Sequence, residues 1–449
     1  MGGGALLKLA ATASLIAATS AIVPLRAEDL PTVPQYDAAV HLGVASCAAS
    51  TCHGGAVAAE GGVVLQNENT TWQTLDKHSQ AYAVLSNDVS KRIARNLGLK
   101  DATGAKVCLD CHADNVPAER RGPQFQLTDG VGCEACHGGS QNWIQVHAIN
   151  DNATSHRRNV AAGLYPTPDP QSRARMCLSC HLGDQTKLVT HRIMGAGHPR
   201  LSFELDTFTA IEPAHHVVDD DYRARKRVAD GVQVWAIGQA MALAQTMDGL
   251  LDPKRGRDGL FPELVFFDCH ACHKPMSAAS WRERSSLGLG PGVVRFNDAN
   301  LIMLRIVARA VSPALGEKIA GRGRALHQAS QAGQSQWENA ARQLRAAALE
   351  ASDTFAGHRF GQRDLRAILD ALVQEGTRGE YVDYVAAEQN TMAIGSILSA
   401  MRQADWIGQA EYDRTQKLMD EMYATVAQDE KYRPTAHLAA LRRLQGVGR

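Results

Sequence analysis

Apolar residues recur at helical spacing through most of the second half of the chain. The segments 298–311, 314–331, 334–354, 363–375, 380–403, 409–427 and 434–444 share this periodicity and are rich in Ala, Leu, Gln and Arg. Gly and Pro punctuate the boundaries between them. The pattern predicts an antiparallel helical bundle from about residue 297 to residue 449.

The first half of the chain has a less regular pattern. Residues 28–42 are Pro-rich and predict an extended segment. Residues 72–96 carry apolar positions at helical spacing and predict a helix that is broken near Ser86, and residues 221–250 predict one long helix. The region 98–181 lacks long periodic stretches, so we expect short helices and loops there.

A cysteine motif is repeated through this irregular part of the chain. Four copies read Cys-x-x-Cys-His, and a fifth has four residues between its cysteines. The cysteine pairs are Cys47/Cys52, Cys108/Cys111, Cys133/Cys136, Cys177/Cys180 and Cys269/Cys272. All ten cysteines are used, and a histidine follows the second cysteine of every pair.

This spacing is typical of the covalent attachment of a c-type haem. Each thiol adds across one vinyl group of the porphyrin, and the histidine that follows supplies the proximal ligand of the iron. The predicted proximal ligands are His53, His112, His137, His181 and His273. The sequence therefore predicts five haem c groups in a mainly α protein whose short helices and loops wrap around them.

Two other uses of paired cysteines fit the pattern less well. The pairs Cys108/Cys111 and Cys133/Cys136 have the spacing of a four-thiolate zinc site, but zinc does not require a histidine after every second cysteine. Cysteines in Cys-x-x-Cys form redox-active rather than structural disulfides. The chain has only 17 histidines in 449 residues, so the regular placement favours haem attachment.

Composition and the N-terminal pattern suggest a compartment. Residues 9–23 form an apolar run after Lys8, too short for a membrane span, and a cleavage site is expected after Ala27. We therefore expect a signal peptide over 1–27 and a periplasmic protein without a membrane span, with an uncleaved anchor as the alternative. Lys and Arg balance Asp and Glu, 47 against 47, and haem propionates add negative charge, which argues against nucleic acid as a partner.

These features predict a pentahaem cytochrome domain over 28–296 and a helical bundle domain over 297–449. Haem iron with two imidazole ligands is closed and suited to electron transfer, whereas iron with one can bind a substrate. Beyond the five predicted proximal ligands the chain has twelve other histidines, so every iron could be closed. The candidate distal ligands are His78, His147, His191, His198 and His215. His327, His358 and His437 in the bundle are expected to be packing or surface residues.

The order of motifs resembles a known family. It runs from the first site through Trp72 and His78-Ser79-Gln80-Ala81 to Gly130-Val131-Gly132-Cys133-Glu134-Ala135-Cys136-His137-Gly138, then His147 and the site of Cys177. Over residues 43–181 this is similar to the cytochrome c-554 family, the tetrahaem periplasmic cytochrome of ammonia-oxidising bacteria. The fifth site and the bundle lie outside the resemblance, and the first site departs from the pattern by two extra residues.

The resemblance implies which histidine is the distal ligand of each haem iron. His78 would be distal to the haem of His137, and His147 would be distal to the haem of His53. The haem of His112 would have no distal ligand, unless His41 closed it. His191, His198 and His215 compete for the fourth haem, and the fifth should take another of them.

Two classes of function follow. The favoured one is an electron carrier that passes electrons between other redox proteins through its haems. The alternative is a multihaem oxidoreductase that acts on a small nitrogen or sulfur compound at one open haem, with His112 the first choice of site and His53 the second. In either case the bundle could dock a partner and make the chain a subunit of a larger redox complex.

The short linker between His112 and Cys133 predicts that the haem of His112 and the haem of His137 are neighbours.

Overall fold

The computed structural model describes residues 26–61, 64–149, 154–259, 261–273, 284 and 286–447. The predicted signal peptide therefore lies outside the described residues except for its last two positions, Arg26 and Ala27. Ala27 is buried, and its backbone N–H donates a hydrogen bond of 2.7 Å to Oδ1 of Asp353.

The prediction of a mainly α protein is confirmed. The described β structure is one antiparallel hairpin, in which β1 (Arg257–Asp258) pairs with β2 (Phe261–Pro262) and Arg257 lies opposite Pro262. None of the helices in the described ranges combines the length and the apolar character that crossing a membrane requires.

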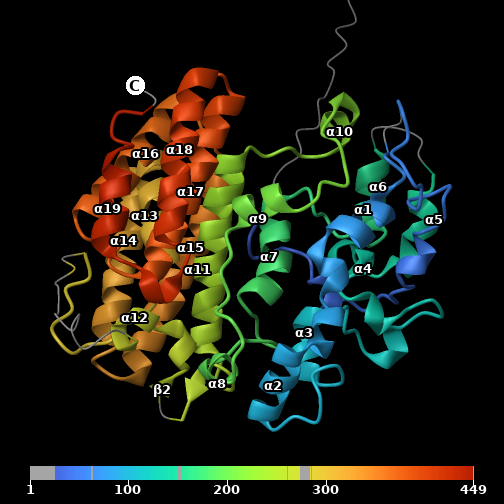
Figure 1. The fold of residues 1–449 in the computed structure, drawn as a ribbon, viewed down its shortest axis with the longest axis horizontal. Helices are drawn as coiled ribbons and strands as arrows, with labels where there is room; N and C mark the ends of the chain where they lie inside the picture. The colour runs from blue at the N-terminus through green and yellow to red at the C-terminus, as the bar shows by residue number, and fades with distance from the viewer. Residues whose placement is uncertain are drawn as a thin grey trace, which may run out of the picture.

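The C-terminal helices form a bundle, seen in yellow to red in Figure 1. They are α13 (Ala299–Val311), α14 (Pro313–Ala329), α15 (Gln334–Gly357), α16 (Gln362–Thr377), α17 (Tyr384–Gln403), α18 (Gln409–Thr425) and α19 (Pro434–Arg442). Each matches a segment predicted from the periodicity to within a few residues, because an amphipathic stripe identifies a helix that packs on one face.

One earlier helix also lies in the bundle. The segment 221–250 forms two helices, α10 (Asp220–Arg225) and α11 (Gly231–Leu251), because the Asp230 side chain caps a new helix by accepting from the backbone N–H of Gln233. α11 packs along α15, and Figure 1 shows it on the inner side of the bundle. Trp235 and Ile237 of α11 are fully buried, since the helix is covered almost all round.

The rest of the chain is built from short helices. They are α1 (Glu68–Leu75), α2 (Asp88–Leu97), α3 (Lys106–His112), α4 (Cys133–His137), α5 (Ile144–His147), α6 (Ser155–Ala161), α7 (Pro170–His181), α8 (His191–Gly195), α9 (Leu205–Ile211) and α12 (Cys269–Cys272). The predicted helix over 72–96 is broken at Asp76 and again at Asn87, which caps α2.

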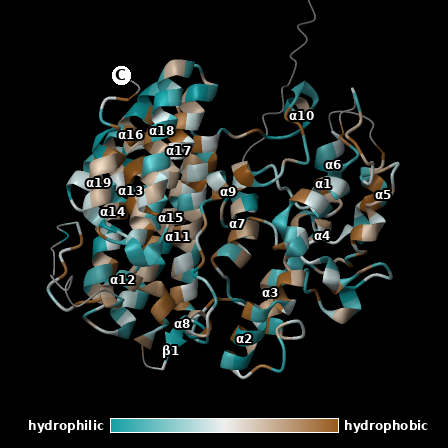
Figure 2. Cartoon of the chain, in the orientation of Figure 1, coloured by the Kyte–Doolittle hydropathy of each residue, from teal (hydrophilic) through white to brown (hydrophobic). Residues whose placement is uncertain are grey.

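The two parts differ in how they bury apolar side chains. One continuous core joins α7, α9 and α11 to the bundle helices, whereas α2 and α3 share only a small cluster around Leu85 and Leu109. Figure 2 shows brown, hydrophobic residues among teal ones on the helices of both parts. In Figure 1, α7 and α9 lie between the bundle and the part that contains α1 to α6. The short-helix part therefore has little protein core of its own.

Candidate haem-binding sites

The cysteine motifs are called sites 1 to 5 in chain order, by their histidines His53, His112, His137, His181 and His273. Sites 2, 3 and 4 form the C-terminal ends of α3, α4 and α7, and the cysteines of site 5 form α12. On a helix, residues three apart project from the same face, so both cysteines of a motif can reach one ligand. Site 1, with its longer spacing, begins after a 3-10 turn at Val44–Ser46 instead.

Each motif histidine faces a second histidine from elsewhere in the chain. Their ring centroids are 5.9 to 6.4 Å apart. The pairs are His53–His147, His112–His198, His137–His215, His181–His78 and His273–His191. All ten histidines predicted as ligands are thus used, once each.

The separation of the rings suits a shared metal ion. An imidazole nitrogen binds a first-row metal at about 2 Å, so two imidazoles on opposite sides of one ion have ring centroids about 6 Å apart. That is the spacing of all five pairs. The residues present therefore fit an iron held between two histidines at every site.

Several of these rings are also held by their other nitrogen. Nδ1 of His53 lies 2.9 Å from Glu68, and Nδ1 of His78 lies 2.9 Å from Asp76. Nδ1 of His112 donates to the carbonyl of Ala81, and Nδ1 of His198 donates to that of Pro199. A bonded Nδ1 fixes the ring orientation and leaves Nε2 for a metal, which is the usual arrangement of histidine ligands.

Burial keeps other rings in the neutral form that a metal requires. It lowers the pKa of His137 to about 3, with His215 adding to the shift, and lowers the pKa of His181 to about 4. The carboxylates have the opposite effect on their partners. The hydrogen bond that His53 donates to Glu68 raises the pKa of His53, and the one that His78 donates to Asp76 raises the pKa of His78.

Comparison with known proteins agrees with this chemistry. Residues 46–138, which carry sites 1 to 3, match the family model described as cytochrome c554 and c-prime. This segment is cytochrome c554-like. The match supports a c-type cytochrome, a class of protein that holds haem iron covalently and takes part in electron transfer. Neither the curated proteins nor the solved structures include a match to this chain.

Two expectations drawn from the resemblance are corrected by the ring geometry. His78 does not face His137; it faces His181, and His215 takes the place opposite His137. Site 2 is not open either, because His198 faces His112. The expected partner of His53, His147, is the residue that faces it.

His198, and not His41, is the histidine whose ring faces His112. The side chain of His41 is fully buried and its Nδ1 bonds to Asp114 at 2.7 Å. Of the bundle histidines, His327 and His437 are buried among packed helices, and His358 bonds to Asp364 at 3.0 Å.

The motif cysteines show which sites are neighbours. All ten lie in described ranges, and none forms a disulfide. The thiols of Cys47 and Cys133 interact directly, which joins site 1 to site 3, and those of Cys111 and Cys180 join site 2 to site 4. Cys136 and Cys177 are close enough to interact electrostatically, which brings site 3 beside site 4.

Cys52 departs from the enclosed setting of most motif cysteines. It is exposed, and its Sγ lies 3.9 Å from the hydroxyl of the adjacent Thr51, whereas Cys47 of the same motif is partly buried against Cys133. The reason is the longer spacing, because Cys52 lies in a turn rather than on a helix and does not share a helical face with Cys47. Cys272, at the end of α12, is also exposed. The surroundings of Cys52 give no support for haem binding. Its role as a haem-binding cysteine therefore stays a prediction from the motif.

Site 5 continues this series from site 2. Short helix α8 begins at His191, which faces site 5, and the chain reaches His198, which faces site 2, one turn after α8 ends. The spatial order is therefore 1–3–4–2–5. The short linker between His112 and Cys133 predicted sites 2 and 3 as neighbours, but the direct cysteine contacts pair each of them with a different site.

The bundle contributes residues to the end of the series. Oδ1 of Asp429, from the turn before α19, lies 2.8 Å from Nε2 of His270 inside motif 5. The same carboxylate pairs with Arg200, two residues after His198, and Arg200 also bonds Glu388 of α17 at 3.0 Å. Sequence reasoning missed these contacts, because an Arg in a loop and an Asp in a distant turn carry no pattern that joins them.

A second anchor follows site 5. Asp268, just before Cys269, pairs with Arg295, which also bonds Asp383 at 3.0 Å. Arg284 is buried and makes two bonds to Asp298 and one of 2.9 Å to Glu380. These ion pairs fasten the region around site 5 to the start of α13 and α17.

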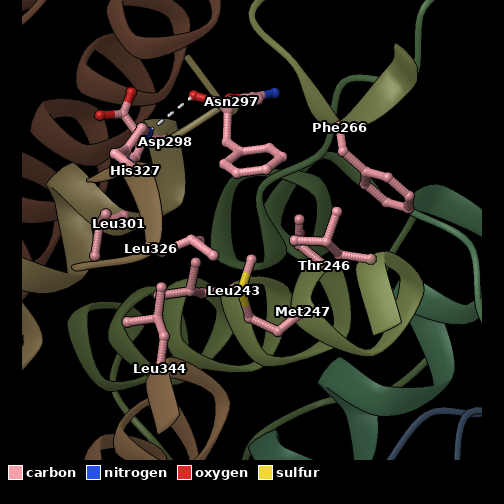
Figure 3. Close-up of a pocket in the computed structure, with 12 residues that line it drawn as sticks. Leu243, Thr246, Met247, Phe266, Asn297, Asp298, Leu301, Leu326, His327 and Leu344 are labelled. Atoms are coloured by element: carbon pink, nitrogen blue, oxygen red, sulfur yellow. Dashed lines mark hydrogen bonds between the residues drawn. The ribbon is translucent and has the colours of Figure 1, made fainter. Parts of the chain in front are cut away.

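Two other features resemble binding sites. Asp76, His78 and Glu212 are the group of described residues whose ligand atoms lie close enough for a metal ion, but Nδ1 of His78 is bonded to Asp76 and its ring faces His181. An interior void between α11, α13 and α14 is lined mainly by Leu, Met and Phe, with His327 beside Asp298 at one end (Figure 3). It has room for about one water molecule and no larger ligand.

Proposed function

We propose that this chain is a periplasmic pentahaem c-type cytochrome that carries electrons between redox partner proteins. The observation that supports it is the set of five motif histidines, each facing a second histidine at one ring separation. The ten motif cysteines would bind five haem c groups. Bound haem supplies one-electron redox chemistry, and two imidazole ligands close the iron to substrates.

The arrangement of the sites supports a carrier more than an enzyme. The cysteine interactions connect sites 1, 3, 4 and 2 in that order, and the short segment from His191 to His198 links site 5 to site 2. The alternative, an oxidoreductase with one open iron, requires a motif histidine that faces no second imidazole. His112 and His53, the candidates for such a site, face His198 and His147.

The test is spectroscopy of the purified holoprotein. A pyridine haemochrome assay should give five haems per chain, and the oxidised protein should show only low-spin iron. The reduced protein should not bind carbon monoxide. Fewer than five haems, or a high-spin component that binds carbon monoxide in the unmodified protein, would contradict the proposal and favour the enzyme.

A further inference from the structure

A buried lysine lies where sites 2 and 4 meet. Lys187 follows α7 in the loop that leads to α8, and its side chain is only 5% exposed. Asp184 forms the turn that directs it inward, since its Oδ1 accepts the backbone N–H of Thr186 at 2.7 Å and of Lys187 at 3.1 Å. The long side chain then passes between the two motifs.

The ammonium group contacts both motifs at once. Nζ lies 3.3 Å from Sγ of Cys180 in site 4 and 3.3 Å from the carbonyl oxygen of Asp110, between the cysteines of site 2. It also donates to Oε1 of Gln35. All three N–H groups of the ammonium therefore have an acceptor, as a buried cation requires.

No carboxylate in the described ranges forms an ion pair with Nζ of Lys187. The nearby Asp184 carboxylate is bonded by the hydroxyl of Tyr36 at 2.7 Å, and the ring of Tyr36 lies 5.5 Å from Nζ. Lys106 offers the contrast, because it also reaches motif 2 but is exposed and pairs with the Asp110 carboxylate. A charge held inside the protein is screened far less than one in water.

We propose that the buried charge of Lys187 raises the reduction potentials of the haems at sites 2 and 4. This inference rests on the proposed electron-carrier function. Reduction removes one positive charge from a site, so a fixed cation nearby stabilises the reduced form. Of these two sites, site 2 should have the higher reduction potential. There both rings donate to backbone carbonyls, of Ala81 and Pro199.

Carboxylates act in the opposite direction elsewhere in the series. Glu68 on Nδ1 of His53 makes that ligand more basic and stabilises oxidised iron at site 1. Asp76 on Nδ1 of His78 does the same at site 4 and opposes part of the effect of Lys187. Together, Lys187, Glu68 and Asp76 should make the reduced form most stable at site 2, toward the end of the series that adjoins the bundle.

The experiment is a spectropotentiometric titration of the full holoprotein carrying Lys187→Gln. Two of the five one-electron components should move to lower potential, with the reduced-to-oxidised ratio falling roughly tenfold, which is about 59 mV for one electron. The other three should stay in place. Lys91→Gln is the control and should move none, because Lys91 and its partner Asp88 are both exposed to solvent.

A second variant covers the case in which Lys187→Gln does not yield holoprotein. Gln35→Glu places a carboxylate beside the ammonium and should lower the same two potentials while Lys187 stays in place. If five low-spin haems are present and neither variant moves any component, the inference is wrong and the proposed function stands. If the unmodified protein lacks five low-spin haems, the proposed function itself fails.

Discussion

The rings of His112 and His198 lie 6.4 Å apart at an angle of 83°, although the two residues come from different elements. This arrangement would give site 2 a second imidazole, where the family resemblance implied none. We expect His198→Ala to create one high-spin iron in five and to allow carbon monoxide to bind after reduction, because site 2 then has a single imidazole.

His216→Ala is the control for that experiment. The ring of His216 lies 5.8 Å from that of the predicted ligand His215 and stacks on Tyr222 at 5.3 Å, but it faces no motif histidine. Optical and electron paramagnetic resonance spectra of this variant should match those of the unmodified protein. A fully low-spin His198→Ala protein would show that site 2 takes its second ligand from elsewhere.

Glu134 inside motif 3 should be a large contributor to stability. Its buried carboxylate accepts backbone N–H groups from Leu42, Gly43 and Ser140 at 2.7 to 2.8 Å. Glu134→Ala leaves these donors without a partner and should lower the free energy of unfolding by about 3 kcal/mol or more. Denaturant titration measures it, and hydrogen exchange should rise at residues 42 and 43.

The matched substitution is Glu119→Ala, at an exposed position of the same part of the chain. It should change the free energy of unfolding by no more than about 0.5 kcal/mol. Equal effects of the two substitutions would mean that the three bonds to Glu134 contribute nothing of their own.

His41 should make stability depend on pH. Burial disfavours its charged form, but the hydrogen bond and charge of Asp114, with Glu134 nearby, outweigh burial and raise its pKa above 6.5. A group whose pKa is higher in the folded state stabilises the protein below the unfolded pKa. This contribution is therefore complete below about pH 6.5 and is lost as the pH rises through the raised value.

His41→Gln removes the titrating group. The denaturant midpoint of the unmodified protein should fall above pH 6.5 by more than that of the variant, with both measured on holoprotein. The same slope in both proteins would assign the pH dependence to other groups.

Arg284 should be essential for the join between site 5 and the bundle. Its side chain is 3% exposed and faces Asp298, Glu380 and Asp383. Arg284→Met leaves the buried carboxylate of Asp298 without its cation, while Asp383 keeps Arg295 and Glu380 keeps Arg305. It should destabilise the protein by about 3–5 kcal/mol in thermal or denaturant unfolding. Arg309→Met, which breaks an exposed pair with Glu317, should cost about 1 kcal/mol at most.

The sequence by itself determined the parts of this protein that depend on local pattern. Five haem attachment motifs could be read directly, because two thiols and a histidine must lie within a few residues to hold one haem. The helices from Ala299 to Arg442 could be predicted because each has an apolar stripe of helical period. Ten candidate ligand histidines could be selected, and of the pairings implied by the resemblance only His53 with His147 is the one observed.

Only the tertiary structure decided which histidine faces which. A motif histidine meets its partner across a long stretch of loops, and no period or spacing encodes that meeting. His78 faces His181 rather than His137 because the loop after α9 brings His215 to site 3. The burial of Lys187 between two motifs likewise depends on where loops pack, since an isolated lysine in a sequence is ordinarily a solvated charge.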